Sequence, residues 1–377
     1  MCLKVVTPVN ISDGIVLGAK DYLYDSRRQK VFFLNLHQWH MFIYKHMLLE
    51  KYESYLANFR DKQSLLEWLR MQGYDIDDVR TVITSEAQAT VNLMDSERKK
   101  TLNDINRHIQ QPDGSLYVPG SSIKGVFRTA ILYSLLQKRQ DIKGKYWRQI
   151  QEKISSNYFK PYRDFNKLIS DLENELLHTL RLLDGNIRSN NAVCSAMRGL
   201  QVSDTYASRN VQTAILQKVD GGFDKFGKAS PKKLPIFREC MLPEAELFFD
   251  VKIEKAVMNT IGINTVDDLL KATHSFFAAV TDLLQQAFEK EYQEAFQGVA
   301  AGNMFLGGNT GFLSKTLLAM LAPDKDTAKN TIKVLLDKSF KTHKHLLRDK
   351  VIAPRTLKCT NYNGKLMLMG VAEVHKV

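Results

Sequence analysis

The stretch Tyr117-Val-Pro-Gly-Ser-Ser-Ile-Lys-Gly-Val-Phe-Arg128 predicts the end of a strand, a tight turn and the first turns of a helix. Pro119-Gly120 breaks the strand, and Ser121 or Ser122 is expected to cap the helix. The N-terminus of a helix presents backbone N–H donors and the positive end of a dipole. The stretch therefore predicts an anion site, with phosphate as the expected anion.

The helix predicted over residues 122–139 has an apolar stripe and a separate basic face. The stripe consists of Ile123, Phe127, Ala130, Ile131, Ser134 and Leu135. Lys124 and Arg128 lie one turn apart on another face. The candidate binding residues of this first glycine-rich turn are Gly120, Ser121, Ser122, Lys124, Gly125 and Arg128.

A second glycine-rich stretch, Phe305-Leu-Gly-Gly-Asn-Thr-Gly-Phe-Leu-Ser-Lys-Thr316, has a similar plan. We expect a helix over 312–321 with Lys315 on its first turn. Glycine lets a backbone approach a phosphate closely, and successive N–H groups can form an anion nest. A side chain at Gly308 should obstruct that approach, whereas one at Gly302 should do less. The candidate binding residues here are Gly307, Gly308, Asn309 and Lys315.

Both glycine-rich stretches have a plainer interpretation, in which glycine only permits a positive φ or close backbone packing. Neither has the Gly-Lys-Ser/Thr order of a nucleotide-binding P-loop. From the residues alone, backbone punctuation and anion binding both stay open.

The charge of the chain favours a polyanionic partner. Its 377 residues carry a formal net charge of +12, and residues 315–377 hold thirteen Lys/Arg against five Asp/Glu. The four cysteines, at 2, 194, 240 and 359, are too far apart for a zinc knuckle, so free thiols in a reducing cytosol are expected. No apolar run reaches about 18 residues, so a membrane span is not expected.

Two further cations are candidates for anion binding. Arg209 follows a predicted strand, and Lys225 lies in the basic loop 220–233. Phe223 and Phe226 in that loop either present stacking surfaces or dock the loop onto its own domain, and the sequence leaves both open. The histidines near residue 40 lack a carboxylate or cysteine at ligand spacing, so neither a metal nor another cofactor is expected.

The remaining chain alternates predicted strands and helices. Strands are expected over 3–10, 31–36, 85–92, 105–109, 116–118, 200–203, 213–219, 246–253 and from 365 onward, and helices over 37–72, 145–183 and 265–297. The polar, turn-rich segment 184–191 is the predicted domain boundary. It divides the chain into residues 1–184 and 185–377.

Several of these stretches resemble one family. Val118-Pro-Gly-Ser-Ser-Ile-Lys-Gly-Val-Phe-Arg-Thr-Ala-Ile-Leu132 resembles the glycine-rich signature of the RAMP superfamily, the RNA-binding subunits of CRISPR–Cas effectors. The stretch 305–316 resembles the late glycine-rich segment of the RAMP subunit that ends the backbone filament of the type III-A (Csm) complex. Leu3-Lys-Val-Val-Thr-Pro-Val-Asn-Ile-Ser-Asp-Gly14 is similar to the first RAMP strand and its loop, and 200–205 to a strand that opens the second half.

The resemblance implies an α+β fold of two ferredoxin-like (RRM-like) RAMP domains with helical insertions. It also implies a non-catalytic cytoplasmic subunit that binds the 3′ region of the guide RNA (crRNA), caps the filament and supports crRNA maturation. The implied partners are crRNA, target RNA, the backbone RAMP subunit, the small helical subunit and host ribonucleases. The candidate residues above, Arg209 and Lys225 included, would then contact RNA.

Two other functions stay open. A RAMP-family endoribonuclease could act on repeat or target RNA, and target-cutting members use an acidic residue in an early loop, where Asp13, Asp21 and Asp25 lie here. The residues supply no nucleophilic triad and no His-Asp dyad that spacing alone identifies. The other alternative is an RNA chaperone or ribosome-associated protein outside CRISPR systems.

Overall fold

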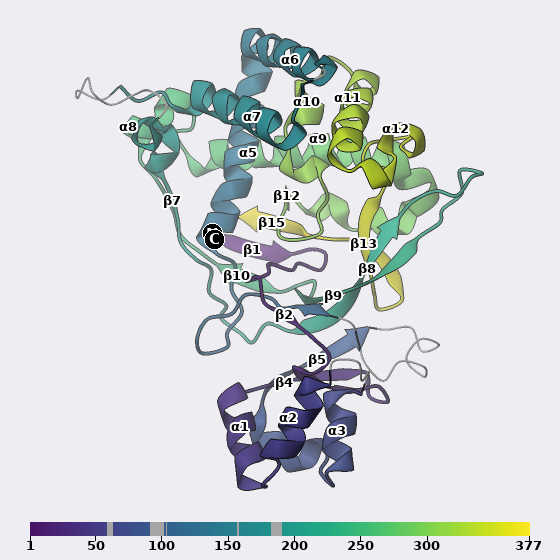
Figure 1. The fold of residues 1–377 in the computed structure, drawn as a ribbon. Helices are drawn as coiled ribbons and strands as arrows, with labels where there is room; N and C mark the ends of the chain where they lie inside the picture. The colour runs from purple at the N-terminus through teal and green to yellow at the C-terminus, as the bar shows by residue number, and fades with distance from the viewer. Residues whose placement is uncertain (59–62, 91–101, 103, 157, 182–190) are drawn as a thin grey trace.

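The computed structural model describes residues 1–58, 63–90, 102, 104–156, 158–181 and 191–377 of the chain. It is a mixed α/β structure in which layers of helices cover sheets (Figure 1). The strands are β1 (Cys2–Val5), β2 (Val16–Leu17), β3 (Tyr22–Asp25), β4 (Lys30–Leu34), β5 (Ile83–Thr90), β6 (Ile105–Asn106), β7 (Leu200–Val202), β8 (Thr213–Gly221), β9 (Lys232–Met241), β10 (Glu246–Phe248), β11 (Val251–Ile253), β12 (Met304–Phe305), β13 (Leu357–Tyr362), β14 (Lys365–Leu368) and β15 (Val371–His375).

The helices fall into α-helices and short 3₁₀ turns. The α-helices are α1 (Leu36–Lys45), α2 (Leu49–Ala57), α3 (Leu65–Met71), α5 (Gly120–Lys138), α6 (Gln140–Ser155), α7 (Pro161–Leu177), α8 (Lys255–Met258), α9 (Val266–Tyr292), α10 (Leu318–Leu321), α11 (Lys325–Ser339) and α12 (His345–Arg348). The 3₁₀ turns are η1 (Ile76–Val82), η2 (Ala192–Cys194), η3 (Ala196–Gly199), η4 (Asn259–Ile261), η5 (Gln293–Phe296), η6 (Val299–Ala301), η7 (Leu313–Lys315) and η8 (Lys341–His343).

The larger sheet has the strand order β2-β6-β9-β8-β5-β4-β3, and β13 also pairs with β8. The long β8–β9 hairpin runs through its middle and extends to one side of the molecule (Figure 1). Its neighbours β5 and β6 come from the first half of the chain and pair in parallel with β8 and β9. The sheet therefore joins strands from both sides of the predicted domain boundary.

A second, four-stranded antiparallel sheet, β10-β1-β15-β12, joins the two ends of the chain. Leu3 of the first strand pairs with Val374 of the last. Helices α5 and α9 pack against each other, and Phe127 and Phe277 on them share one core with Leu3 and Phe305 of this sheet. Most of the predicted boundary segment lies outside the described residues, so the division into two domains stays a prediction.

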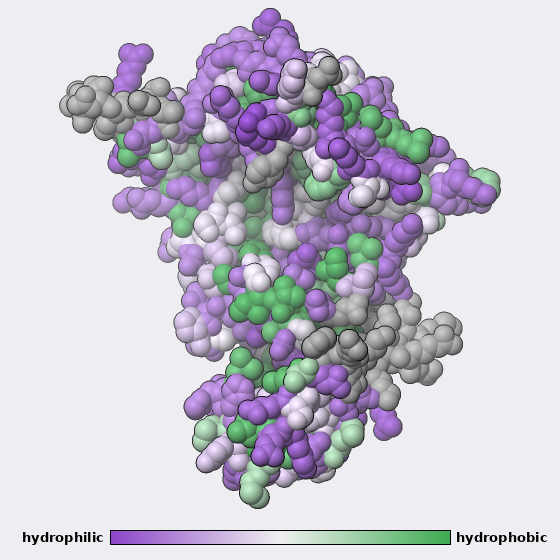
Figure 2. Space-filling model, viewed as in Figure 1, coloured by the Kyte–Doolittle hydropathy of each residue, from purple (hydrophilic) through white to green (hydrophobic). Residues whose placement is uncertain are grey.

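The helices α1 to α3 form a separate layer over β3 and β4, at the lower end of the molecule in Figure 1. Its core is aromatic, with Trp39, Tyr52, Tyr55 and Trp68 in mutual ring contact. Figure 2 shows hydrophobic residues scattered among hydrophilic ones on this layer, and Met47 is 90% exposed. The predicted helix over 37–72 is thus three short helices around an aromatic core.

The apolar stripe of the first predicted helix is confirmed in part, because Ile123, Phe127, Ala130 and Ile131 are buried in α5. Farther along, Leu132 and Leu136 are buried, whereas Ser134 and Leu135 are only partly covered.

Two other local predictions are wrong. The strand predicted over 246–253 is divided between β10 and β11, which join different sheets. The strand predicted from residue 365 is also divided, because Gly370 at φ 79° turns the chain between β14 and β15.

Candidate nucleic-acid interface

The first glycine-rich turn lies against the strand end at 202–204. A Cβ at Gly120 would come closer than 3.0 Å to the carbonyl oxygens of Val202 and Ser203. The Gly120 N–H donates to Oδ1 of Asp204 at 2.7 Å. A carboxylate of the chain itself therefore occupies the start of α5, where the sequence predicts a phosphate.

This contact also corrects the predicted helix cap. Helix α5 begins at Gly120 with Pro119 at its N-cap position, and neither serine side chain makes a capping bond within the described chain. Ser121 is exposed and Ser122 is partly covered. The prediction failed because the capping oxygen comes from Asp204, which is remote in sequence.

The basic face of α5 is only partly free. Lys124 is half-buried, and desolvation, with a smaller effect of Arg128, lowers the pKa of its ammonium group. Arg128 forms an ion pair with Glu173 of α7. A Cβ at Gly125 would meet no described atom within 4 Å, so this glycine faces open space.

The second glycine-rich stretch lies on Asn10, in the loop after β1. Gly307 has φ 86°, and a Cβ there would come closer than 3.0 Å to the Asn10 carbonyl oxygen. The Gly308 N–H donates to that oxygen at 2.7 Å. Asn309 also has a positive φ, 61°, and its side-chain amide contacts the sulfur of Met369.

Packing within the chain differs between Gly302 and Gly308, whereas the expected effect of side chains there on the approach of a phosphate stays a prediction. A Cβ at Gly302 would come closer than 3.0 Å to Cγ1 of Val371 in β15. At Gly308 the nearest atom would be Nη1 of Arg238 at 3.1 Å, the mobile end of a long side chain. Gly302 is therefore the more tightly packed position, because β15 lies directly against it.

The helix predicted over 312–321 is also corrected. A 3₁₀ turn, η7, ends at Lys315, Thr316 is extended at φ −138° and ψ 151°, and α10 begins only at Leu318. Lys315 is therefore the last residue of a short turn instead of a first-turn helix residue.

Four cations lie at this second loop, and we call them the second-loop cation cluster: Lys218 of β8, Arg238 of β9, Lys315 of η7 and Lys358 of β13. Arg238 and Lys358 approach Gly308 and Gly311, and Lys218 is near enough to both cations to feel their charge. Lys218 and Lys358 both reach Asp220, at 3.7 and 2.9 Å. Adjacent strands produce this arrangement, because Lys358 pairs directly with Asp220 in the sheet.

Electrostatics show that the cluster is crowded. Desolvation lowers the pKa of Lys218, Lys315 and Arg238, and neighbouring cations lower it further for the two lysines: Lys358 acts on Lys218, and Arg238 acts on Lys315. One carboxylate, Asp220, faces several cations. Binding of an additional anion is favourable at such a site, because the anion reduces the repulsion between the like charges.

The position of Arg238 is fixed by the loop after β1. Its Nη1 donates to Oδ1 of Asn10 at 3.0 Å, and Asn10 Nδ2 donates to the Glu239 carbonyl at 2.8 Å. The Arg238 Nε is buried with no hydrogen-bond partner among the described residues. Sequence reasoning missed Lys218, Arg238 and Lys358, because strand lysines and arginines form no motif until the fold pairs the strands.

A groove of about 400 Å³ continues from the cluster between α5, α7 and η7. Its lining residues are Thr129, Leu132, Phe165, Asn166, Ile169, Ser170, Glu173, Phe312, Lys315, Thr316 and Leu317. Lys315 thus belongs to both the cluster and this α5–α7 groove. The helix of the first glycine-rich stretch and the second glycine-rich stretch are far apart in the sequence, but both line this groove.

The other two candidate cations lie elsewhere. Arg209 is exposed at a pocket of about 420 Å³ that Glu244 and Glu246 also line. Lys225 is exposed in the turn of the β8–β9 hairpin, 4.8 Å from the ring centre of Phe226. The structure does not bring either cation into the second-loop cation cluster.

The two phenylalanines of that turn take different roles. Phe223 stacks on Phe288 of α9 with ring centres 5.3 Å apart, so it docks the loop. Phe226 is 75% exposed and stays available for a partner. The docking interpretation therefore holds for Phe223, and the stacking interpretation stays a prediction for Phe226.

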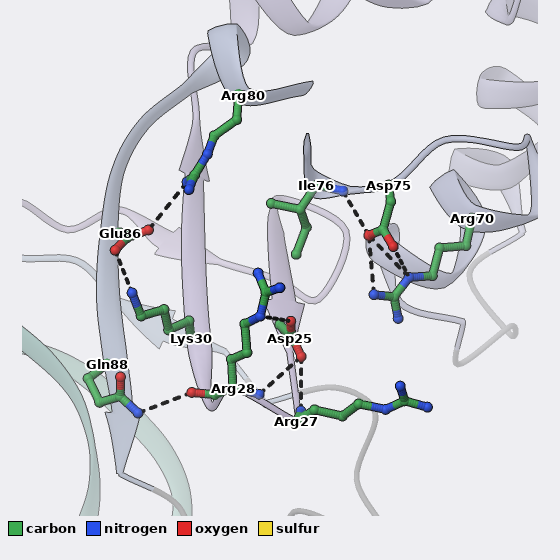
Figure 3. A network of polar contacts seen from close by, with 10 residues as sticks. All are labelled: Asp25, Arg27, Arg28, Lys30, Arg70, Asp75, Ile76, Arg80, Glu86 and Gln88. Carbon is green, nitrogen blue, oxygen red and sulfur yellow. Dashed lines mark hydrogen bonds and ion pairs between the residues drawn. The ribbon is translucent and has the colours of Figure 1, made fainter. Parts of the chain in front are cut away.

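The early acidic residues hold turns together. Asp13 Oδ1 accepts from the Ile15 N–H, and Asp21 Oδ2 from the Gly18 N–H, both at 2.7 Å. Asp25 is 6% exposed and accepts from the N–H groups that follow it, as Figure 3 shows with its polar neighbours. Within the described chain, no three or more His, Cys, Asp or Glu side chains gather as metal ligands would.

Of the helices that the structure describes, none combines the length and the apolar character that crossing a membrane requires.

Known proteins resemble this chain along its whole length. The "CRISPR system Cms protein Csm5" of Mycobacterium tuberculosis is 26% identical, over 99% of this chain and 96% of its own. The Csm5 protein of Enterococcus italicus is 23% identical, over 90% and 85%.

Two solved structures share the fold. One is a chain of a Csm-crRNA-target RNA ternary complex of a type III-A CRISPR-Cas system, with a TM-score of 0.67 and 18% identity over 99% of both chains. The other is Csm5 of T. onnurineus, with a TM-score of 0.60 and 18% identity over 99% of this chain and 100% of that one. The sequence model of the RAMP superfamily matches residues 2–312, and the chain therefore belongs to the RAMP superfamily.

Proposed function

We propose that the chain is an RNA-binding subunit of a type III-A (Csm) CRISPR effector complex. It binds the 3′ region of the crRNA, caps the filament of backbone RAMP subunits and supports crRNA maturation. Its partners are crRNA, target RNA, the backbone RAMP subunit and the small helical subunit, and it helps to recruit host ribonucleases. The end-to-end similarity to proteins named Csm5 supports the assembly part of this proposal.

The observation that carries the RNA-binding part is the second-loop cation cluster. Lys218, Arg238, Lys315 and Lys358 lie together at a glycine-rich backbone, and the carboxylate of Asp220 pairs with two of them, Lys218 and Lys358. Cations that are partly desolvated and mutually repelled favour a polyanion, and RNA supplies a phosphate at every nucleotide. Neither Arg209 nor Lys225 has comparable surroundings, so we assign them secondary contacts.

We further propose that the fold consists of two ferredoxin-like (RRM-like) RAMP domains with helical insertions, divided near 184. The four-stranded antiparallel sheet with α5 and α9 against it and the β8–β9 sheet are the two sheets that such domains need, and each of them takes strands from both sides of residue 184. The helices α1 to α3 and the pair α6 and α7 are then the insertions.

The decisive experiment measures the salt dependence of crRNA binding by fluorescence anisotropy. The double variant Lys218→Gln/Lys315→Gln should lower affinity and reduce the slope of log K against log salt by about 1.4, since each neutralised phosphate contributes about 0.7 for single strands. The control is Lys341→Gln/Lys344→Gln, which removes two exposed cations outside the cluster. An unchanged slope in the first variant would refute the assignment of the cluster.

Assembly and catalysis are tested on the same proteins. The wild-type chain should join a reconstituted Csm complex, as native mass spectrometry measures, and complexes without it should carry crRNAs of abnormal 3′ length. Labelled repeat and target RNA should stay intact with the purified chain in Mg²⁺. Mg²⁺-dependent cleavage that EDTA abolishes would instead establish the endoribonuclease alternative.

A further inference from the structure

We propose that the α5–α7 groove binds one unstacked base of the RNA strand whose phosphates lie on the second-loop cation cluster. The inference rests on the proposed RNA-binding function and adds a specific site to it. The groove thus holds a base, whereas the cluster holds the backbone.

The lining of the groove suits a planar, partly polar ligand. Leu132, Phe165, Phe312 and Leu317 give it an apolar floor. The exposed Asn166 and Ser170 of α7 stand at its edge. Its volume of about 400 Å³ falls within the range of small-molecule pockets, which are mostly apolar with a few polar groups for orientation.

The chemistry of single-stranded RNA matches these features. Proteins bind unstacked bases on aromatic side chains and contact the base edges through hydrogen bonds. Two separate segments supply aromatic surface: Phe165 lies on α7, and Phe312 immediately precedes η7. An amide such as Asn166 both donates and accepts, so it can pair with the edge of any base.

Continuity with the cluster argues for RNA over other ligands. Lys315 lines the groove. Desolvation lowers the pKa of its ammonium group, and the nearby charge of Arg238 lowers that pKa further. A strand whose phosphates contact Arg238 and Lys315 therefore has a base within reach of the groove. The Glu173 carboxylate at the wall would repel such a strand, but its ion pair with Arg128 offsets that charge.

The experiment combines abasic RNA with groove variants. A series of crRNA 3′ fragments, each with one abasic nucleotide, is titrated against the wild-type chain. One position should lose roughly 10-fold in affinity, since stacking of a base on an aromatic residue contributes about 1–3 kcal/mol. Phe165→Ala should lose a similar factor on intact RNA and nothing further on that abasic RNA.

Two further variants keep the test decisive. Asn166→Ala/Ser170→Ala changes only exposed side chains, so the variant should fold. It should bind intact RNA more weakly than the wild type does, and it should show no further loss of affinity for the RNA that is abasic at the sensitive position. Phe340→Ala, at an exposed aromatic residue 52% accessible outside the groove, should leave the series unchanged.

The outcomes separate this inference from the proposed function. RNA binding with a normal salt slope but no position-specific loss overturns the base site alone. Absence of RNA binding overturns both. If Phe165→Ala and Asn166→Ala/Ser170→Ala keep full RNA affinity but fail to enter the complex, the groove binds a neighbouring protein subunit and the base site is wrong.

Discussion

A methyl group added at Gly302, Gly307 or Gly308 should separate backbone packing from RNA binding. At Gly302 and Gly307 the new Cβ would come closer than 3.0 Å to Val371 and to the Asn10 carbonyl, respectively. At Gly308 the nearest atoms would be Nη1 of Arg238 at 3.1 Å and Oδ1 of Asn10 at 3.4 Å, both at the ends of side chains. We therefore expect Gly302→Ala and Gly307→Ala to be unstable, and Gly308→Ala to fold but to bind RNA more weakly.

The magnitudes follow from the nature of each contact. Non-bonded carbon atoms are comfortable at about 3.5–4.0 Å, so Gly302→Ala forces β15 away and should cost about 1–3 kcal/mol, as overpacking does. Gly307→Ala adds strain at φ 86°, about 1–3 kcal/mol more, to a similar overlap with rigid backbone. Gly308→Ala should cost less than about 1 kcal/mol, since the guanidinium can move by a few tenths of an ångström.

Thermal melts and RNA titrations measure the two effects. A loss of 1 kcal/mol lowers the melting temperature by about 2–4 °C in domains of 150–250 residues, so Gly307→Ala should melt roughly 4–24 °C early and Gly308→Ala within about 4 °C of wild type. Gly308→Ala should nevertheless bind crRNA several-fold more weakly, because Arg238 is displaced. Equal melting of all three variants would refute the packing argument, and full RNA affinity of Gly308→Ala would refute the role given to Arg238.

Three further predictions concern single contacts. Arg128→Ala should weaken RNA binding by unmasking Glu173, and Arg128→Ala/Glu173→Gln should recover most of the affinity; no recovery in anisotropy titrations would mean that Arg128 contacts RNA itself. Phe223→Ala should lower the stability by about 2 kcal/mol in urea melts, whereas Phe226→Ala, which removes an exposed ring, should not; equal loss would contradict the docking role. His108 is buried and neutral, with its pKa lowered to about 4 by desolvation against about 6.5 in the unfolded chain, so its contribution to stability should be lost as the pH falls from about 6.5 to 4, by up to about 3 kcal/mol. The wild-type minus His108→Asn difference in urea midpoint should show that trend, and a flat difference would exclude it.

Local patterns in the sequence predicted the elements that depend on near neighbours. The stripe from Ile123 to Ile131 identified α5 within two residues of its observed start, because helical burial repeats every three to four positions. The turn at 111–114 is likewise observed, with the Gln111 N–H donating to the Ser115 carbonyl. Each of these two patterns lies within about a dozen consecutive residues.

The predictions that failed depend on partners remote in sequence. The oxygen at the start of α5 comes from Asp204, and the residue that makes Gly302 essential is Val371. The cations Lys218 and Lys358 meet at Asp220 only because β13 pairs with β8. Composition could indicate a basic protein, but it could not indicate which cations the strands would bring together.

Backbone packing and anion binding are two interpretations of the glycine-rich stretches, and at the second stretch the geometry is compatible with both at once. Gly307 can lie on the Asn10 carbonyl only without a Cβ, and the same Asn10 holds the Arg238 guanidinium through its side chain. Under the proposed function, the glycine therefore contributes to RNA binding indirectly, because it fixes the residue that positions a cation. The first stretch lacks this second step, since its helix start is already paired with Asp204. Substitutions at Gly120 should impair folding before they impair RNA binding, whereas substitutions in the second stretch should affect both.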